Sequence, residues 1–331
     1  MAELGDVNDP RSAQVMSNTT VHRLSDGRFL VFQRSPYVLV YDSVGRYVGH
    51  IGRQGEGPGE FKAPWSLAVD ASDSIWVAEF GGKVTVLGPD GVAGRVLPTR
   101  SAMIPQIQGF TPSGRPVVLQ APRYGGLLEV WSRDGSLEWT LGVEAADTTG
   151  RSSVNVVAPQ LVVMLEDTVA LVRSIAGGHR IERWTPGTVD TVLRSGDIGR
   201  AYQERFIDAP VEPDNVYVSS LTPGADGAVW GLAGEVVFDL SQLPVAPGQE
   251  GVAVTLENRN LQWDGLLWRW DPADGTITVM EKIPQLPSGF VDGRHFFSFR
   301  EDEFGLLIVQ VWRAANLCKR AARGASTPTL S

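Results

Sequence analysis

The sequence has a single cysteine, Cys318, among its 331 residues. One cysteine forms no disulfide within the chain, and it excludes the zinc sites that several cysteines build together. Cysteine usage therefore indicates no cellular compartment.

Long apolar runs and a basic charge are missing as well. The longest apolar stretch, Val154 to Val172, is interrupted by Pro159, Glu166 and Asp167, whereas a membrane-spanning helix needs about 20 apolar residues. The formal net charge is -9, and binding to a phosphate backbone requires a basic surface. We therefore expect neither a transmembrane segment nor a nucleic-acid partner. The first ten residues lack an apolar core, so they form no signal peptide.

Short turns of Asp-Gly type recur along the chain at intervals of about 40 to 66 residues. They lie at Asp26-Gly27, Asp73-Ser74, Ser113-Gly114, Glu166-Asp167, Asp226-Gly227 and Asp292-Gly293. Each is followed by two strand-like runs, and the second run ends in a large residue, namely Tyr41, Leu87, Trp131, Trp184, Trp270 or Trp312. Short alternating strands between tight turns indicate a meander of four strands, A to D from the inside outward. No segment shows a helical period over three turns.

Radial repetition of such sheets protects their edge strands, so the sequence predicts an all-β fold, a six-bladed β-propeller of four-stranded antiparallel blades. We place the blades and a C-terminal tail near residues 17-52, 65-98, 107-142, 160-194, 216-283, 287-313 and 318-331. Few residues follow the last blade, so an N-terminal strand is expected to complete it, either near Glu3 to Gly5 or from residues upstream of Met1. The fifth repeat is longest, and we interpret its residues 233-260 as a hairpin inserted between strands B and C. A seventh, degenerate blade is the alternative.

The link between the first two repeats is rich in glycine. Residues 51-61 read Ile-Gly-Arg-Gln-Gly-Glu-Gly-Pro-Gly-Glu-Phe, and Leu-Ala-Val-Asp follows at 67-70. This stretch resembles the NHL repeat, and the chain is similar to NHL-repeat-like bacterial six-bladed propellers of largely unassigned function. The resemblance implies a periplasmic, cell-envelope or secreted protein, with a cytoplasmic interaction module as the alternative. The glycines allow sharp bends, and Phe61 is expected to fill the gap between neighbouring sheets.

The face with the B-to-C and D-to-A loops is where catalytic propellers of this kind carry their reactive groups. The candidate ligand-binding residues on that face are Arg34, Trp65, Glu79, Arg123, Arg173, His179, Trp263 and Arg300. A ring of arginines around a channel mouth suits an anionic small molecule or an acidic glycan. A solvated rim of paired charges is the interpretation that we favour over such a ring.

Motifs for catalysis or metal binding are scarce. The four histidines, His22, His50, His179 and His295, are spread over three repeats, whereas zinc needs about three convergent ligands. No cofactor is evident, and calcium held by carboxylates and carbonyls is the candidate metal. No GxSxG nucleophile motif occurs, and no catalytic residue is assigned.

These features together favour binding over catalysis. We expect a monomeric, non-catalytic binding or scaffold propeller that presents its loop-rich face to a protein or glycan ligand. The alternative is a calcium- or zinc-dependent lyase or hydrolase with its site at the central channel.

Overall fold

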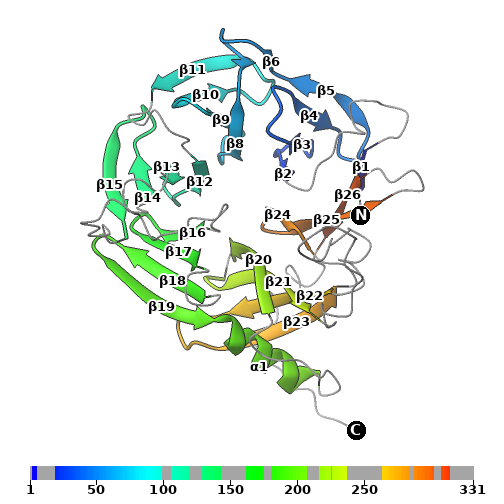
Figure 1. Ribbon diagram of the computed structural model, residues 1–331, viewed down its shortest axis with the longest axis vertical. Helices are drawn as coiled ribbons and strands as arrows, with labels where there is room; N and C mark the ends of the chain where they lie inside the picture. The colour runs from blue at the N-terminus through cyan, green and yellow to red at the C-terminus, as the bar shows by residue number, and fades with distance from the viewer. Residues whose placement is uncertain are drawn as a thin grey trace, which may run out of the picture.

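The chain forms a ring of six four-stranded antiparallel sheets around a central axis, as the computed structural model in Figure 1 shows. This arrangement confirms the predicted six-bladed β-propeller. The structure describes residues 2–5, 19–98, 106–119, 128–142, 162–174, 180–206, 216–224, 226–236, 263–283, 287–301 and 307–313. Among these residues, no helix is long and apolar enough to cross a membrane.

The first three blades follow one another along the chain. Blade 1 contains β2 (Thr20–Arg23), β3 (Phe29–Phe32), β4 (Val38–Tyr41) and β5 (Tyr47–Ile51). Blade 2 contains β8 (Pro64–Val69), β9 (Ile75–Glu79), β10 (Lys83–Leu87) and β11 (Ala93–Pro98). Blade 3 contains β12 (Gln106–Phe110), β13 (Pro116–Leu119), β14 (Leu128–Trp131) and β15 (Leu137–Leu141). In each blade the first strand is innermost (Figure 1).

The last three blades repeat this order, except that the sixth is completed from the other end of the chain. Blade 4 contains β16 (Val162–Glu166), β17 (Val169–Ser174), β18 (Arg180–Thr185) and β19 (Thr188–Arg194). Blade 5 contains β20 (Val216–Pro223), β21 (Val229–Val236), β22 (Trp263–Trp270) and β23 (Ile277–Ile283). Blade 6 contains β24 (Gly289–Asp292), β25 (His295–Glu301), β26 (Leu307–Arg313) and β1 (Ala2–Leu4).

The N-terminal strand β1 closes the ring against β26. The two strands are antiparallel, with Leu4 opposite Val309, and the Leu4 side chain is fully buried. The Glu3 carboxylate accepts hydrogen bonds from Arg300 at 2.9 and 3.1 Å and from Gln310 at 2.9 Å. Apolar packing and charge-assisted hydrogen bonds therefore join the two ends of the chain.

The apolar core lies between neighbouring blades. Phe61 is fully buried and packs with Leu30 and Phe32 of blade 1 and with Leu67 and Ile75 of blade 2. This confirms that Phe61 fills the gap between the two sheets. The link that carries it forms a short parallel pair of β6 (Arg53–Gln54) with β7 (Glu60–Phe61).

Gly52 is a glycine of this link where an added side chain would meet both the buried Phe61 ring and the backbone. Its φ is +86°, and a Cβ atom there would lie 2.5 Å from the Phe61 ring and 2.7 Å from the Pro36 carbonyl oxygen. We expect Gly52→Ala to lower the free energy of unfolding by about 1 to 3 kcal/mol, through positive-φ strain and overpacking. Denaturant unfolding measures the change. Gly81→Ala is the control, since its φ is +98° but nothing lies within 4 Å of the added atom; an equal loss in both variants would contradict the packing argument.

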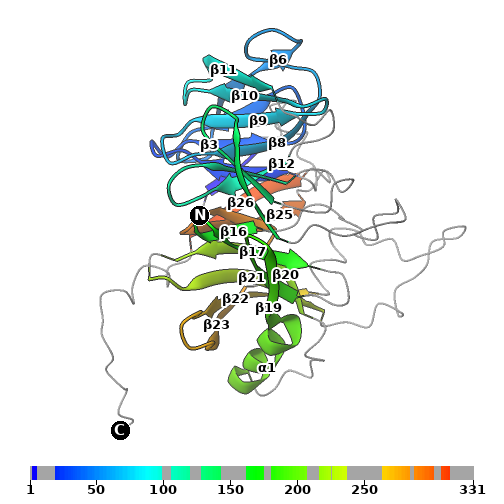
Figure 2. The same cartoon turned by 90° about the vertical axis from the view of Figure 1, so that its left-hand side faces the viewer.

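One helix, α1 (Ser195–Arg205), was not predicted from the sequence. It follows β19 and packs on β20 and β23 at the rim of the ring (Figure 2). Gly196 and Gly199 weaken its helix propensity and obscure its apolar pattern. Ile198 and Tyr202 are nonetheless fully buried in the core between blades 4 and 5, so tertiary packing stabilises the helix.

The first four residues of the insertion expected in blade 5 lie in a strand. Residues 233–236 continue strand β21, whose pairing with β22 extends to Val236 opposite Trp263. Strands β21 and β22 are thus longer than the corresponding strands of blade 1, and the hairpin itself stays a prediction. The remaining predicted insertion, 237–260, lies outside the described residues.

Candidate functional site

The strand connections lie on two opposite faces of the ring. The A-to-B and C-to-D turns, such as 24–28 and 42–46, form what we call the turn face. The B-to-C and D-to-A connections form the loop face. The described connections on the loop face are 33–37, 52–63, 80–82 and the segment that contains α1. Blades 1 and 2 therefore provide the best view of this face.

A stacked pair, Arg34 and Trp65, lies at the loop face where blades 1 and 2 meet. The Arg34 guanidinium carbon is 3.7 Å from the centre of the Trp65 ring, well within the range of a cation–π contact. Trp65 is the extra residue of a β-bulge between Pro64 and Ser66, and bulges redirect side chains. The innermost strand of blade 2 thus presents its indole to Arg34.

The backbone of Arg34 has an uncommon conformation. Its φ is +56°, a region that residues with a Cβ atom rarely adopt and that costs on the order of 1 to 3 kcal/mol. Partial burial lowers the pKa of Arg34, yet arginine stays protonated in proteins. The site therefore holds a permanent cation in a conformation that the fold must stabilise.

Other cations around this pair are already neutralised. They pair as Arg53 with Glu60, Lys62 with Glu56 and Lys83 with Glu79, all at 2.6 Å. Arg34 differs, because within the residues described here it forms no ion pair and no hydrogen bond. Among the described residues, no carboxylate therefore neutralises the charge of Arg34.

Glu79 holds the nearby link in place. Its side chain is only 3% exposed, and it accepts a hydrogen bond of 2.8 Å from the backbone N–H of Lys62. In the strand register Glu79 lies opposite Pro64, the neighbour of Trp65. The structure therefore brings Glu79 to the same region as Arg34 and Trp65, where it positions the backbone beside them.

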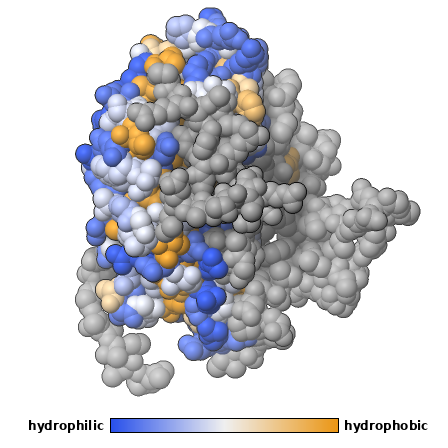
Figure 3. All heavy atoms as spheres, turned by 60° about the vertical axis from the view of Figure 1, so that its left-hand side comes forward, coloured by the Kyte–Doolittle hydropathy of each residue, from blue (hydrophilic) through white to orange (hydrophobic). Residues whose placement is uncertain are grey.

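Two exposed aromatic side chains belong to this part of the loop face. Figure 3 shows apolar and polar surface interspersed over one flank of the described residues. The exposed large apolar residues in the described segments are Tyr37, Val44, Val48, Phe80, Val92 and Val96. The two aromatics, Tyr37 and Phe80, both belong to loop-face connections of blades 1 and 2. Phe80 is 59% exposed, and its backbone N–H donates to the Ala63 carbonyl at 2.9 Å.

Phe80 was missed in the sequence analysis. It follows the last residue of β9 and precedes Gly81 and Gly82, so the available signal was an aromatic residue placed in a tight turn rather than in a strand. Tyr37 lacks such a signal, since it directly precedes the buried strand β4. Its ring meets the His50 ring edge-on at 5.0 Å.

Two further candidate arginines belong to other blades and have their own partners. Arg173 in β17 is buried, donates a hydrogen bond to the Val218 carbonyl and lies 4.8 Å from the centre of the Tyr217 ring. Arg300 in β25 forms the bonds to Glu3 described above. The structure therefore does not bring these arginines together with Arg34.

For three predicted site residues the structure describes no side chain. Arg123 and His179 lie outside the described residues, and so does the side chain of Trp263, whose backbone begins β22. In the described segments, no group of three His, Cys, Asp or Glu side chains could hold a metal ion.

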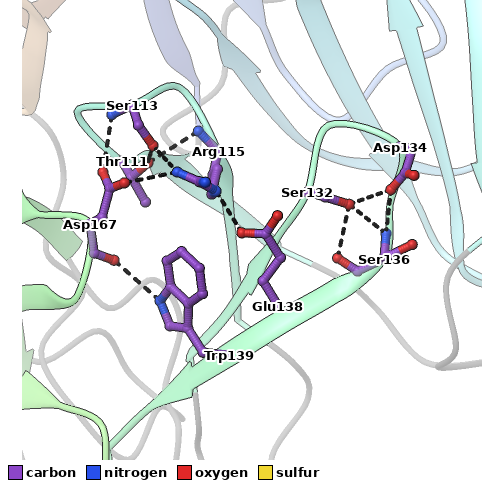
Figure 4. A network of polar contacts seen from close by, with 9 residues as sticks. All are labelled: Thr111, Ser113, Arg115, Ser132, Asp134, Ser136, Glu138, Trp139 and Asp167. Atoms are coloured by element: carbon purple, nitrogen blue, oxygen red, sulfur yellow. Dashed lines mark hydrogen bonds and ion pairs between the residues drawn. The ribbon is translucent and has the colours of Figure 1, made fainter.

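The turn face is cross-linked between blades 3 and 4, as Figure 4 shows. The Asp167 carboxylate accepts hydrogen bonds from the Ser113 backbone N–H at 3.1 Å and from Arg115 at 2.8 Å. Arg115 also pairs with Glu138, and the Trp139 indole N–H donates to the Asp167 carbonyl at 3.2 Å. Hydrogen bonding by Ser113 lowers the pKa of Asp167. This network holds two blades together.

Comparisons with known proteins agree with the architecture. A family model described as "6-bladed beta-propeller" matches residues 16–91, and no curated protein sequence matches the chain. A solved protein from Bacteroides fragilis NCTC 9343, described as exported, is 12% identical over 94% of each chain, with a TM-score of 0.51. A catalytically inactive virginiamycin B lyase from Staphylococcus aureus, solved with quinupristin, is 13% identical over 95% of this chain and 88% of its own, with a TM-score of 0.49. At 12% identity the likeness to the Bacteroides protein is one of fold, and the family model describes the fold as a six-bladed β-propeller.

Proposed function

We propose that the protein is a binding propeller, which presents its loop face to a protein or glycan ligand that carries carboxylate groups. The observation that carries this proposal is the Arg34 guanidinium, stacked on Trp65 at 3.7 Å and without an ion pair among the described residues. Arg53, Lys62 and Lys83 form ion pairs with glutamates of the chain. Arg34 is therefore the cation of this region that we expect to bind a ligand carboxylate.

The geometry of the pair suits recognition of a carboxylate. Trp65 lies against the planar guanidinium at 3.7 Å, and a guanidinium edge can donate two parallel hydrogen bonds to one carboxylate. The stacking also fixes the guanidinium, so less side-chain entropy is lost when the ligand binds. Phe80 adds a flat apolar surface for the part of the ligand next to its acid group. The strained backbone of Arg34 supports the same view, because such strain gathers at functional sites.

Export from the cytoplasm is part of this proposal. Its support is the resemblance of residues 51-61 to the NHL-like bacterial propellers, and the Bacteroides structure described as exported. No metal is assigned a role in binding.

An affinity series tests the function. Calorimetric titration with an oligogalacturonide, which carries one carboxylate per sugar, is compared with a neutral oligosaccharide of equal length and with an acidic peptide. We expect Arg34→Ala to weaken binding of the acidic probe by about 10- to 100-fold, since a hydrogen bond to a charged group contributes roughly 1.5 to 3 kcal/mol. Trp65→Ala is expected to weaken it as well, because the guanidinium loses its support.

The matched control is Arg46→Ala. Arg46 is an exposed arginine of the same blade, but it lies in a C-to-D turn on the turn face. Its removal changes the net charge equally and should leave the affinity unchanged. The proposal fails if neither acidic probe binds, or if Arg34→Ala and Arg46→Ala have the same affinity. Preference for the oligogalacturonide or for the peptide identifies which kind of ligand the face takes.

A further inference from the structure

One position in strand C of each blade faces the following blade. In four blades it holds a buried valine, namely Val40, Val86, Val130 and Val311. These positions are equivalent because each lies opposite the corresponding residue of strand B. Val130, for example, pairs with Val117 in blade 3, and Arg183 pairs with Leu171 in blade 4. Blade 4 has the exposed Arg183 at this position, and blade 5 has Arg269. In blades 4 and 5 an arginine thus replaces the valine that packs between neighbouring blades elsewhere in the ring.

The wedge between blades 3 and 4 shows what normally fills this space. Val130 is fully buried, and its cross-strand neighbour is Trp139. Trp139 lies against Arg115, with 5.2 Å between the guanidinium and the ring centre, and reaches Asp167 of the next blade (Figure 4). A valine and a tryptophan therefore close this interface.

Between blades 4 and 5 the corresponding residues are polar. The cross-strand neighbour of Arg183 is Asp190, and the two side chains form no ion pair among the residues that the structure describes. A cleft with a volume of about 460 Å³ opens at this interface on the turn face. Its apolar wall comes from Val169, Leu171 and Trp270.

Some of the charged side chains that line the cleft form ion pairs within the chain, and others do not. Asp226 and Asp271 line it, but both pair with Arg269, at 3.1 and 3.3 Å. Glu166 also lines the cleft and is itself exposed. Arg183 is the cationic side chain that lines the cleft, and it forms no ion pair with any of the described residues.

We propose that this cleft binds a small amphipathic carboxylate, whose apolar body packs on Val169, Leu171 and Trp270 and whose acid group is bound by Arg183. The volume falls in the range of small-molecule sites, roughly 300 to 1,000 Å³, and such sites combine apolar walls with a few polar groups that orient the ligand. The guanidinium recognises a carboxylate with two parallel hydrogen bonds. The site lies on the turn face, so it is independent of the binding function proposed for the loop face.

Two probes of this chemistry test the site. 8-Anilinonaphthalene-1-sulfonate is an aromatic anion that fluoresces when it binds apolar surface, and 4-phenylbutyrate is a small carboxylate that should displace it. We expect saturable binding of one dye molecule per chain, full displacement by 4-phenylbutyrate and at least tenfold weaker displacement by the uncharged 4-phenylbutanol. If both competitors act equally, the cleft recognises no carboxylate and the proposal is wrong.

Single-residue variants test whether 4-phenylbutyrate binds in this cleft. Arg183→Val installs the residue that four other blades carry, so it should fold, and it should weaken 4-phenylbutyrate binding at least tenfold. Asp190→Asn removes a competing carboxylate beside Arg183 and should strengthen binding. The control is Arg133→Val, which removes an exposed arginine from a turn of blade 3 and should change nothing. Equal affinities for Arg183→Val and Arg133→Val would overturn the proposal.

Discussion

Replacing Leu4 with alanine should lower the free energy of unfolding by about 2 to 5 kcal/mol, the usual cost of truncating a fully buried leucine. Leu4 is 0% exposed and packs in the core that joins blade 6 to blade 1, together with Val21, Phe29 and Val309. It belongs to β1, which in the described part of the chain is the N-terminal strand that pairs with the C-terminal strands of blade 6. The variant should therefore loosen the closure of the ring as well as the local packing.

Denaturant unfolding of the full chain measures this effect. Val48→Ala is the matched control, because Val48 lies on the outer strand of blade 1 and is 58% exposed; such surface changes stay within about 0.5 kcal/mol. Gly45→Ala offers a second route to the same strand, since its Cβ atom would lie 2.2 Å from the Glu3 carbonyl oxygen. If Leu4→Ala and Gly45→Ala were both as stable as Val48→Ala, β1 would not close the ring.

Stability should fall as the solution is acidified below neutrality, because of His22. Burial lowers the pKa of His22 from 6.5 to about 4, and its Nε2 atom is buried without a hydrogen-bond partner among the described residues. Between these two pH values the unfolded chain binds a proton at this side chain and the folded chain does not. The stability contribution is thus complete above pH 6.5 and is lost as the pH falls toward 4.

The loss from pH 6.5 to about 5 is on the order of 2 kcal/mol, at about 1.4 kcal/mol for each pH unit. Most carboxylates titrate below this window, so the histidine contribution stands out there. Unfolding free energies of wild type and His22→Gln across the window provide the measurement, and the variant should show the flatter dependence. His50→Gln, which alters an exposed histidine of the same blade, should keep the slope of the wild type. A slope that survives His22→Gln would show that another group causes it.

The repeat pattern was sufficient to predict the fold, because each blade is specified locally. In blade 2, for example, the predicted turn at Asp73-Ser74 directly precedes β9, and Leu87, the predicted end of the second run, is the last residue of β10. Turn residues with fixed backbone preferences and short alternating strands carry this information in sequence order. Phe61 could be placed for the same reason, since the glycines around it leave one large apolar side chain to fill the gap.

Features that depend on packing between distant segments were not predictable. The helix α1 exists because Ile198 and Tyr202 are buried against blade 5, which its glycine-containing sequence does not reveal. Arg34 and Trp65 were both predicted as site residues, but their stacking requires a positive φ at one and a β-bulge at the other. Neither conformation can be read from the residue types alone. The partners of Arg300 likewise include Glu3, from the opposite end of the chain.

Hydrogen exchange in the presence of the oligogalacturonide tests the proposed binding face most directly. If the ligand binds at Arg34 and Trp65, amide protection should increase in segments 33–37, 62–66 and 79–82 of the loop face, and the turns at 42–46 and 88–92 should exchange as in the free protein. The Arg34→Ala variant should show no protection at the same ligand concentration. Protection confined to the turn face, or protection that persists in Arg34→Ala, would contradict the assignment of this face as the binding surface.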